Sequence, residues 1–259
     1  MDFQKIKKNI YNISVIFIIC LFFTLFFFEN SKLESNLSKE EKGILSLSFD
    51  DGYISHYNLA YPLMEKYEFK GTEYLVANWS KKFEDKELMT FEQAKEMQFN
   101  EWEIGSHGLN HANLAFLSKE DLEKNLNLSR EILIKEGFNI SSIAFPYGSY
   151  NKNISNSVKN YYFSARPLIN DYNLRNSENL YELKSKWIDK NSEVIEVCSW
   201  IKYAKLNNLW LILVFHNIKD SPTEYWDEST KDFQEILKCI NESNIEVKTI
   251  SGVINEKRD

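Results

Sequence analysis

The chain has 259 residues, 43% of them hydrophobic and 15% aromatic, which is enough to build the core of one large domain or two small ones. Its eight Gly and four Pro exclude a collagen-like or linker-dominated protein. Its net charge of -7 disfavours a nucleic-acid-binding protein, which needs a basic face, and says nothing finer about a substrate.

The first predicted element is an apolar segment at residues 10–28, which follows Lys5, Lys7 and Lys8. A helix needs about 20 apolar residues to span a bilayer, so this length favours a transmembrane helix. A cleaved signal peptide has a shorter apolar core and a small-residue cleavage site, and residues 26–31 offer no such site. We therefore expect an uncleaved signal anchor; a cleaved signal and a buried soluble helix are the alternatives.

The lysines predict how this anchor is oriented. Positive residues before a span favour a cytoplasmic N-terminus, so we expect residues 1–9 in the cytoplasm and the main domain outside the membrane. Residues 29–42 are polar and lack an apolar period, which indicates a tether, and 43–259 form the predicted globular domain. This domain would be secreted if segment 10–28 were cleaved.

The globular part begins with strand and helix signals in alternation. A β-rich run at 44–49 ends in Asp-Asp-Gly, and a second such run occupies 72–76. Between them, Leu59, Leu63 and Met64 form an apolar stripe at helical spacing, which predicts a helix.

Two capping-box sequences, at 90–93 and 118–121, predict the next helices, because a hydroxyl and a later acidic or amide side chain satisfy free N–H groups at a helix start. Gly137 suits the left-handed position that ends the second of these helices. The remaining predicted elements are a strand at 143–145, a strand at 210–215, a helix from Ser229 and a strand at 245–250.

Strands that alternate with helices predict an α/β fold built from parallel βαβ units. In a parallel barrel, functional residues gather at the carboxyl ends of the strands. Asp50, Asp51, the 146–148 turn and His216 all follow predicted strands, so we expect them at one edge of the sheet. Periodicity alone does not distinguish a barrel from a doubly wound sheet.

The residue types at these strand ends predict a metal-hydrolase site. Carboxylate oxygen and imidazole nitrogen bind zinc-like divalent ions, and three protein ligands leave a coordination position for water. His107 and His111 are four residues apart, so a helix or tight turn would aim both imidazoles the same way. Taken alone, such a pair is more often two surface histidines on a loop.

Ordered motifs lie between residues 44 and 250. They are Leu47-Ser-Phe-Asp-Asp-Gly52, Lys70-Gly-Thr-Glu-Tyr-Leu-Val76, Glu103-Ile-Gly-Ser-His-Gly-Leu-Asn-His111, Phe145-Pro-Tyr-Gly148 and Leu213-Val-Phe-His216. In this order and spacing they resemble the polysaccharide deacetylases of the NodB-homology type, carbohydrate esterase family 4. The resemblance implies an irregular (β/α)7 barrel that removes N-acetyl groups from an N-acetylglucosamine-containing polymer, such as peptidoglycan, a chitin-like oligomer or an exopolysaccharide, at the cell surface.

The same resemblance implies roles for single residues. Asp51, His107 and His111 bind a divalent metal, usually zinc, with cobalt, nickel or manganese as other choices. Asp50 is the general base for the attacking water, at a site where zinc lowers the pKa of water to about 7. His216 is the general acid that protonates the leaving nitrogen.

The third and fourth motifs are where the chain departs from the family. The backbone N–H of Tyr147 is the implied oxyanion donor. The family often places an Arg where this chain has Ala144, so we hypothesise that Arg166 enters from the next strand end to orient the base. Trp187 and Asp189 lie near the expected fourth motif without forming a clear copy, and surface or core roles are equally open for them.

Two other functions fit the same residues. An O-acetyl polysaccharide esterase would use the same metal and base, since only the leaving atom differs. A non-catalytic carbohydrate-binding module would keep the fold and lack turnover, which the absent Arg and fourth motif would suit. The complete set of expected catalytic and ligand residues counts against the second alternative.

The remaining chemistry-bearing residues receive no site role from the sequence. We expect His56 to face solvent, and Cys198 and Cys239 to be buried thiols on helices rather than a disulfide. The oligomeric state is left open. The possible sugar platforms are Trp79, Trp102, Trp200 and Trp226, none of which is singled out because most tryptophans belong to cores.

Overall fold

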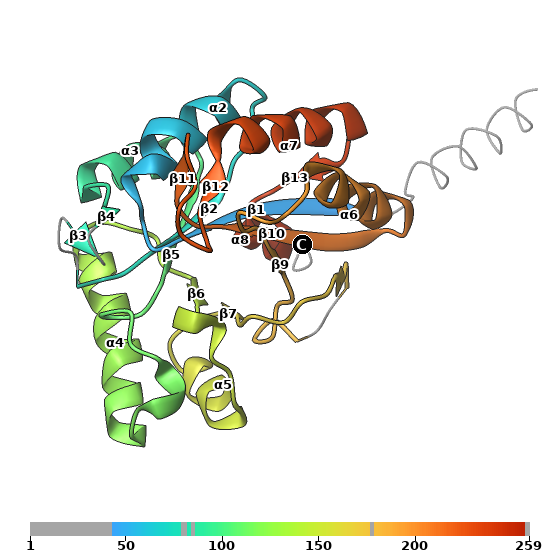
Figure 1. Ribbon diagram of the computed structural model, residues 1–259. Coiled ribbons are helices and arrows are strands. Elements are labelled where there is room, and N and C mark those ends of the chain that lie inside the picture. The colour runs from blue at the N-terminus through green and yellow to red at the C-terminus, as the bar shows by residue number, and fades with distance from the viewer. Residues whose placement is uncertain (1–42, 79–81, 84–85, 177–178, 257–259) are drawn as a thin grey trace, which may run out of the picture. The chain divides into compact units, whose positions relative to one another are not determined.

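The computed structural model describes residues 43–256 except 79–81, 84–85 and 177–178 (Figure 1). The predicted cytoplasmic segment, membrane anchor and tether, at 1–42, lie outside the described residues. Within the described part, no helix combines the length and the apolar character that crossing a membrane requires. The described residues belong to one compact unit that begins at Lys42.

A largely parallel sheet with β1 (Ile44–Asp50) near its middle organises this unit (Figure 1). Its strand order is β7-β6-β5-β2-β1-β10-β8, with β13 beside β1 and β9 beside β10, and β8 is antiparallel to β10. The other strands are β2 (Thr72–Leu75), β5 (Glu103–Ser106), β6 (Ser142–Ala144), β7 (Ser164–Arg166), β8 (Asn173–Leu174), β9 (Lys186–Trp187), β10 (Leu209–Phe215) and β13 (Glu246–Val247).

The predicted α/β class and parallel sheet are confirmed, and the sheet forms a half-barrel. Within the described residues, no strand pairing joins β7 to β8 or β9, so the ladder does not close into a seven-stranded barrel. Two small ladders lie outside the main sheet. They pair β3 (Lys82–Phe83) with β4 (Lys86–Glu87) and β11 (Ile218–Lys219) with β12 (Glu228–Ser229).

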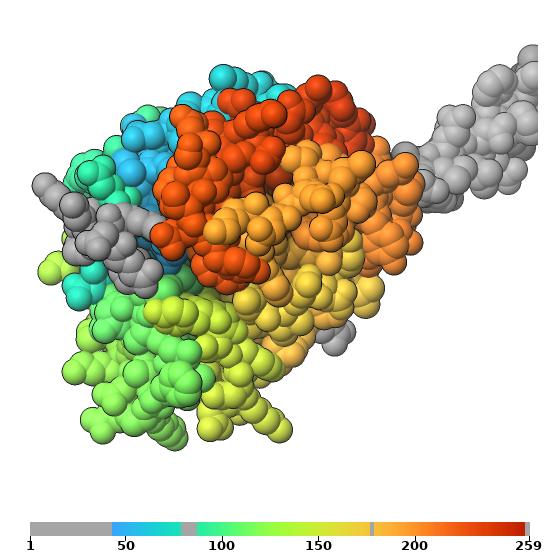
Figure 2. Space-filling model, in the orientation of Figure 1, coloured from blue at the N-terminus to red at the C-terminus, as the bar shows by residue number. Residues whose placement is uncertain are grey.

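Helices cover both faces of the sheet. On one face lie α2, α3, α6 and α7, while α8 lies against the other, and α4 and α5 lie together beside β6 and β7 (Figure 1). Mid-chain segments in green and yellow gather on one side of this unit, and later segments in orange and red on another (Figure 2). The helices are η1 (His56–Ala60), α2 (Tyr61–Glu65), α3 (Phe91–Phe99), η2 (Leu114–Phe116), α4 (Lys119–Lys135), η3 (Pro146–Gly148), α5 (Lys152–Val158), α6 (Val194–Leu206), α7 (Thr230–Ser243) and α8 (Ile250–Asn255).

The apolar strand β10 shows why the core has two parts. Trp210, Ile212 and Val214 join a cluster that includes α8, whereas Leu211, Leu213 and Phe215 join the larger cluster on the opposite face. Successive side chains of a strand point to opposite faces, so a strand covered on both sides is apolar throughout. The near-continuous apolar run in the sequence has this origin.

The sequence-based helix starts are confirmed at two caps, and one predicted strand is wrong. Thr90 and Gln93 form the reciprocal capping box of α3, and the Ser118 hydroxyl accepts the Asp121 N–H at the start of α4. The predicted strand at 245–250 is reduced to two paired residues, because the Thr249 hydroxyl accepts the Gly252 N–H and starts α8.

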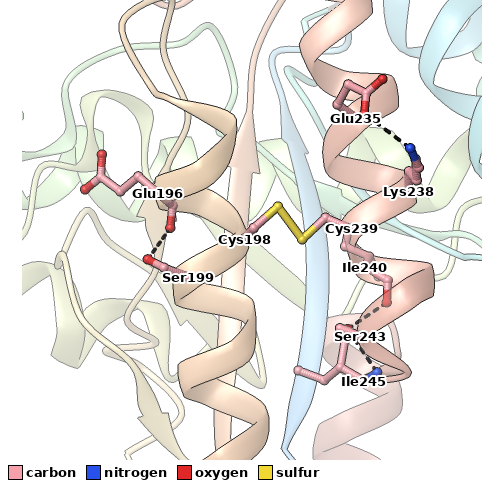
Figure 3. Close-up of a disulfide and its surroundings, with 9 residues drawn as sticks. All are labelled: Glu196, Cys198, Ser199, Glu235, Lys238, Cys239, Ile240, Ser243 and Ile245. Atoms are coloured by element: carbon pink, nitrogen blue, oxygen red, sulfur yellow. Dashed lines mark hydrogen bonds and ion pairs between the residues drawn. A yellow bond between two sulfur atoms is a disulfide. The ribbon is translucent and has the colours of Figure 1, made fainter.

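The expectation of two free thiols is also wrong. Cys198 on α6 and Cys239 on α7 form a disulfide, with their Cα atoms 6.0 Å apart (Figure 3). This separation lies in the usual range for a disulfide, because the two helices pack side by side. Helical spacing within each segment could not reveal that the two cysteines face each other.

Candidate active site

The two adjacent carboxylates occupy the carboxyl end of the central strand. Asp50 is the last residue of β1, and Asp51 begins the turn with a φ of 76°, a conformation that Asp tolerates better than most residues. Both are only 4% exposed. The chain therefore presents two carboxylates from successive residues at one buried point.

His107 and His111 converge on Asp51. Their Nε2 atoms lie 3.4 and 3.1 Å from Asp51 Oδ1, and the three candidate ligand atoms all lie within 4.8 Å of one another. Positive φ angles at Gly108 and His111 turn the chain after β5 so that both rings reach the carboxylate. The structure thus brings together the three residues that the sequence proposed as metal ligands.

The hydrogen bonds of this cluster fit a bound cation. His107 Nδ1 lies 2.9 Å from the Ala144 carbonyl oxygen, which can only accept, so Nδ1 donates its proton. Burial lowers the His107 pKa to about 4, so the ring is neutral and Nε2 carries a lone pair. Burial raises the Asp51 pKa, but the histidines outweigh it and keep the group ionised. A lone pair aimed at a carboxylate oxygen calls for a cation between them.

Asp50 is held by an arginine from the far end of the sheet. Arg166 Nη2 lies 2.5 and 2.6 Å from the two Asp50 oxygens, and both residues are almost fully buried. Arg166 pairs with Ala144 across β6 and β7, so its side chain starts one strand away from the position where the sequence lacks an Arg. The arrangement places a guanidinium on the Asp50 carboxylate from β7, the strand next to the one that ends in Ala144.

His216 completes the group. It follows β10, and its Nε2 lies 3.9 Å from Asp50 Oδ2. Burial lowers the His216 pKa, and the Asp50 carboxylate partly offsets this. Burial alone would raise the Asp50 pKa, but Arg166, His107 and His216 together lower it by more, so the net shift is downward. Asp50 is therefore an ionised carboxylate that can accept a proton.

Tyr147 also lines the cavity. It belongs to the turn after β6, has a φ of 59°, and its ring centroid is 4.6 Å from that of His111. Gly148 is required at the next position, since a Cβ there would lie 2.0 Å from the Leu168 side chain. The cavity holds about 230 Å³ and is lined by Asp50, Asp51, Tyr53, His107, His111, Phe145, Tyr147, Gly148, Arg166, Leu168, His216 and Trp226.

The tryptophans considered as possible sugar platforms, and the residues of the expected fourth motif, lie in different parts of the structure. Trp226 lines the cavity with its ring centroid 5.2 Å from that of His216, and Trp187 packs against Trp226 at 6.4 Å. Trp102 is 2% exposed and belongs to the core. Trp79 lies outside the described residues. Asp189 accepts the Asn191 N–H in its own turn and does not line the cavity.

His56 contradicts the expectation of a solvent-facing residue. It is fully buried, its Nδ1 contacts both oxygens of Glu73 at 3.1 and 3.0 Å, and its Nε2 lies 2.7 Å from the His216 carbonyl oxygen. Its partners are 17 and 160 residues away, so no local pattern reveals them. The one signal in the sequence is Glu73, a charged residue inside the predicted strand 72–76, whose β2 residues are all buried.

Comparison with known proteins places these residues in a family context. Residues 38–165 match the family model described as polysaccharide deacetylase. The chain is 31% identical over 121 residues to YxkH of Bacillus subtilis (strain 168), a protein whose name assigns it provisionally to the polysaccharide deacetylases. That match covers 46% of this chain and 42% of YxkH, so it spans less than half of either protein.

Solved structures share the fold at low sequence identity. The CE4 domain of a multidomain xylanase from the hindgut metagenome of Trinervitermes trinervoides matches with a TM-score of 0.56 and 16% identity, over 84% of this chain and 92% of that one. The peptidoglycan deacetylase PdaC of Bacillus subtilis matches with 0.52 and 17%, over the same shares. A CE4-family pseudoenzyme of Bacillus anthracis matches with 0.58 and 16%, over 83% of this chain and 66% of that one.

Proposed function

We propose that this chain, whose residues 38–165 match the polysaccharide deacetylase family model, is a metal-dependent N-deacetylase of an N-acetylglucosamine-containing polymer. One observation carries the proposal. An ionised carboxylate held by Arg166, an Asp-His-His cluster and a second imidazole share one cavity of about 230 Å³. A pseudoenzyme shares the fold, so the fold alone would not support activity; the complete set of groups does.

Asp51, His107 and His111 would hold the divalent ion. Oxygen and two imidazole nitrogens suit zinc first, with cobalt, nickel or manganese as alternatives. A bound ion would acidify water and polarise the acetyl carbonyl. The Ala144 carbonyl oxygen accepts a hydrogen bond from His107 Nδ1–H, which leaves the Nε2 lone pair free to bind a metal.

Asp50, His216 and Tyr147 would carry the proton and charge steps. Asp50 accepts a proton from water as the water oxygen bonds to the acetyl carbon. The Tyr147 backbone N–H stabilises the negative charge that develops on the carbonyl oxygen, a contribution of about 3 kcal/mol for one such donor. His216 then gives a proton to the nitrogen as the carbon–nitrogen bond breaks, releasing acetate and a free amine.

His216 and Trp226 favour an N-acetyl sugar as the substrate. An amine leaves only after protonation, so a histidine 3.9 Å from the base suits amide cleavage, whereas an alkoxide leaves more readily. The Trp226 ring beside His216 supplies an apolar wall on which a sugar ring can pack. Hydrolysis of an O-acetyl ester is the competing reaction.

The disulfide supports a location outside the cytoplasm. Disulfides persist in oxidising compartments and are rare in the cytosol. The bond between Cys198 and Cys239 therefore supports the proposal that the catalytic domain lies on the outer side of the membrane, as expected for an anchor at 10–28.

Acetate release tests this function. The full-length protein is incubated with N-acetylglucosamine oligomers and with an O-acetylated xylan, with and without added zinc or cobalt. We expect metal-dependent release from the oligomers and at least a hundredfold loss in Asp50→Asn, because general base catalysis contributes about 10²–10⁴-fold. Release from the xylan alone would make the chain an esterase, and no release by metal-loaded protein from any acetylated polymer would refute the deacetylase.

A further inference from the structure

The imidazole of His216 packs beside Trp226 but has no hydrogen bond to a side chain in the described part of the chain. Its Nδ1 is buried and lacks a hydrogen-bond partner there, and its Nε2 faces the cavity 3.9 Å from Asp50. Ring packing alone does not fix a hydrogen-bonding direction, so the direction of the imidazole depends strongly on how the backbone at this residue is held. The segment follows the last residue of β10 and so lies beyond the main sheet's ladder.

Ser55 and His56, which follow the proposed metal ligand Asp51 closely in the chain, hold that backbone by hydrogen bonds. His56 Nε2 donates to the His216 carbonyl oxygen at 2.7 Å. The Ser55 hydroxyl donates to Asn217 Oδ1 at 3.0 Å and accepts the Ile218 N–H at 3.1 Å. Three hydrogen bonds thus join the chain just after Asp51 to three consecutive residues at the general acid.

Glu73 fixes the orientation of the His56 ring. The His216 carbonyl can only accept, so His56 Nε2 carries a proton. One further proton lies between His56 Nδ1 and the Glu73 carboxyl, whose two oxygens are 3.1 and 3.0 Å away. Both side chains are fully buried, so water supplies no substitute partner for either. The pair therefore permits one ring orientation.

Such a pair has no evident value for stability alone. A buried ionic or proton-sharing pair is often no more stable than apolar side chains of the same size, because removing charge from water is costly. Its surroundings are apolar, with the Phe49 ring centroid 5.2 Å from that of His56. Phe49 pairs with Glu73 of β2 on one side and with Phe215 of β10 on the other. The pair therefore reaches across β1, the strand of Asp50, from β2 to the end of β10, which His216 follows.

We propose that His56 and Glu73 are positioning residues that set the place of His216 relative to Asp50. This rests on the proposed function, in which His216 is the general acid. The pair links β2, the segment just after Asp51 and the end of β10. It therefore holds the general acid His216 at a fixed position relative to the general base Asp50. Neither residue lines the cavity, so neither is a catalytic residue.

Two substitutions at His56 separate its two hydrogen bonds. In His56→Asn the amide reaches only the Glu73 side, whereas in His56→Gln the longer amide can still donate to the His216 carbonyl. We expect His56→Asn to lower kcat at least tenfold, with KM and zinc affinity within about twofold of the wild type, because general acid catalysis contributes about 10²–10⁴-fold. His56→Gln should recover most of this loss.

A second readout does not depend on activity. Amide hydrogen exchange at Ile218, measured on the full-length protein, should rise at least tenfold in His56→Asn and much less in His56→Gln, while exchange at Leu47 stays unchanged. If the wild type releases no acetate but this exchange pattern holds, the positioning pair stands and the proposed reaction fails. Wild-type exchange at Ile218 together with wild-type kcat in His56→Asn would overturn the inference.

Two further variants guard against a folding defect. The double change His56→Phe with Glu73→Leu removes both polar members of the buried pair and leaves only the His216 carbonyl oxygen without its donor. It should fold, bind zinc and still show the loss in kcat. Glu103→Gln removes another buried carboxylate, which binds Thr72 and Ser142 away from the cavity, and it should lower stability without changing kcat. A fully active double variant, or an equal kcat loss in Glu103→Gln, would contradict a positioning role.

Discussion

Arg166 contacts Asp50 through a single nitrogen, Nη2, which lies within 2.6 Å of both carboxylate oxygens. A buried carboxylate without this partner would be costly to keep ionised, and its orientation would no longer be fixed. The reach of Arg166 follows from its pairing with Ala144 in the sheet. The guanidinium that orients the base therefore comes from Arg166 on β7, instead of from the position of Ala144 on the adjacent strand β6, and still binds Asp50.

We predict that Arg166→Ala lowers kcat about a hundredfold while zinc still binds in a stoichiometric amount, since general base catalysis contributes about 10²–10⁴-fold. Steady-state kinetics and metal analysis of the same preparation measure the two effects. Arg175→Ala, which removes an arginine that pairs with Glu256 away from the cavity, is the matched control and should retain kcat. Full turnover in Arg166→Ala would remove Arg166 from the mechanism.

Residues with local signals were predictable, and residues with distant partners were not. Asp50, Asp51, His107, His111 and His216 stand in motifs whose residue types and spacing indicate their chemistry. The burial of His56 comes from a carboxylate on another strand and a carbonyl 160 residues away. Such contacts are set by the tertiary fold, which a single sequence does not display.

At the scale of elements, the same distinction holds. Helix caps and the doubly buried strand β10 are local or periodic signals. The Thr90 capping box, the Ser118 cap and β10 are all found where expected, although Ser118 and Asp121 do not form the reciprocal box. The segment 245–250 has an alternating pattern typical of a strand, yet only Glu246 and Val247 pair with β1, and the Thr249 cap then starts a helix. Whether such a segment continues as a strand or starts a helix depends on how it packs in the folded protein, which the local pattern does not show.

The disulfide between α6 and α7 is the first element-scale feature with a measurable effect. It closes a loop with a sequence separation of 41 residues. A bond of this kind restricts the unfolded chain and typically contributes about 2–4 kcal/mol. We predict that the double change Cys198→Ser with Cys239→Ser lowers the free energy of unfolding by this amount, measured by denaturant titration.

Turnover should be unaffected by the same change. No residue that lines the cavity belongs to α6 or α7, so kcat at 25 °C should match that of the wild type. A control with dithiothreitol-treated wild type should show the same loss of stability. Equal denaturation midpoints for the wild type and the double variant would show that the bond does not form in the folded protein.

Glu228, just before the Ser229 cap of α7, gives the protein a pH-dependent stability. Burial is the main cause that raises its pKa to about 8, with Asp232 and Asp189 adding to the effect and the Ser229 N–H opposing it. The folded state therefore holds this proton more tightly than the unfolded state, in which the pKa is near 4.5. Stability should fall as the pH rises from about 4.5 to 8.

We predict that Glu228→Gln removes this fall. At pH 8 the variant should be more stable than the wild type by roughly 2–4 kcal/mol, and at pH 4 the two should be nearly equal. Thermal unfolding at a series of pH values measures the difference. A constant gap between the two proteins across this range would show that Glu228 does not titrate in the folded state.

At the scale of the whole molecule, the parallel sheet explains why distant segments form one site. The carboxyl ends of β1, β5, β7 and β10 lie along one edge, and each is followed by or contains a residue of the cavity. The sequence could indicate this edge because every motif follows a strand. It could not indicate that the sheet stays open, which depends on strand pairs absent between β7 and β9 in the described residues.

A ligand that bridges two of these strand ends should stabilise the entire sheet. Asp51 follows β1, whereas His107 and His111 follow β5, with β2 between them. Metal that binds only the folded state adds RT ln(1 + [L]/Kd), or about 2.7 kcal/mol at a hundredfold excess over Kd. We predict that zinc at this excess raises the free energy of unfolding by about this amount, and that a chelator reverses it. Asp51→Asn should abolish the gain, whereas Asp171→Asn, at a surface ion pair with Lys184, should keep it. A gain that persists in Asp51→Asn would place the stabilising metal at another site.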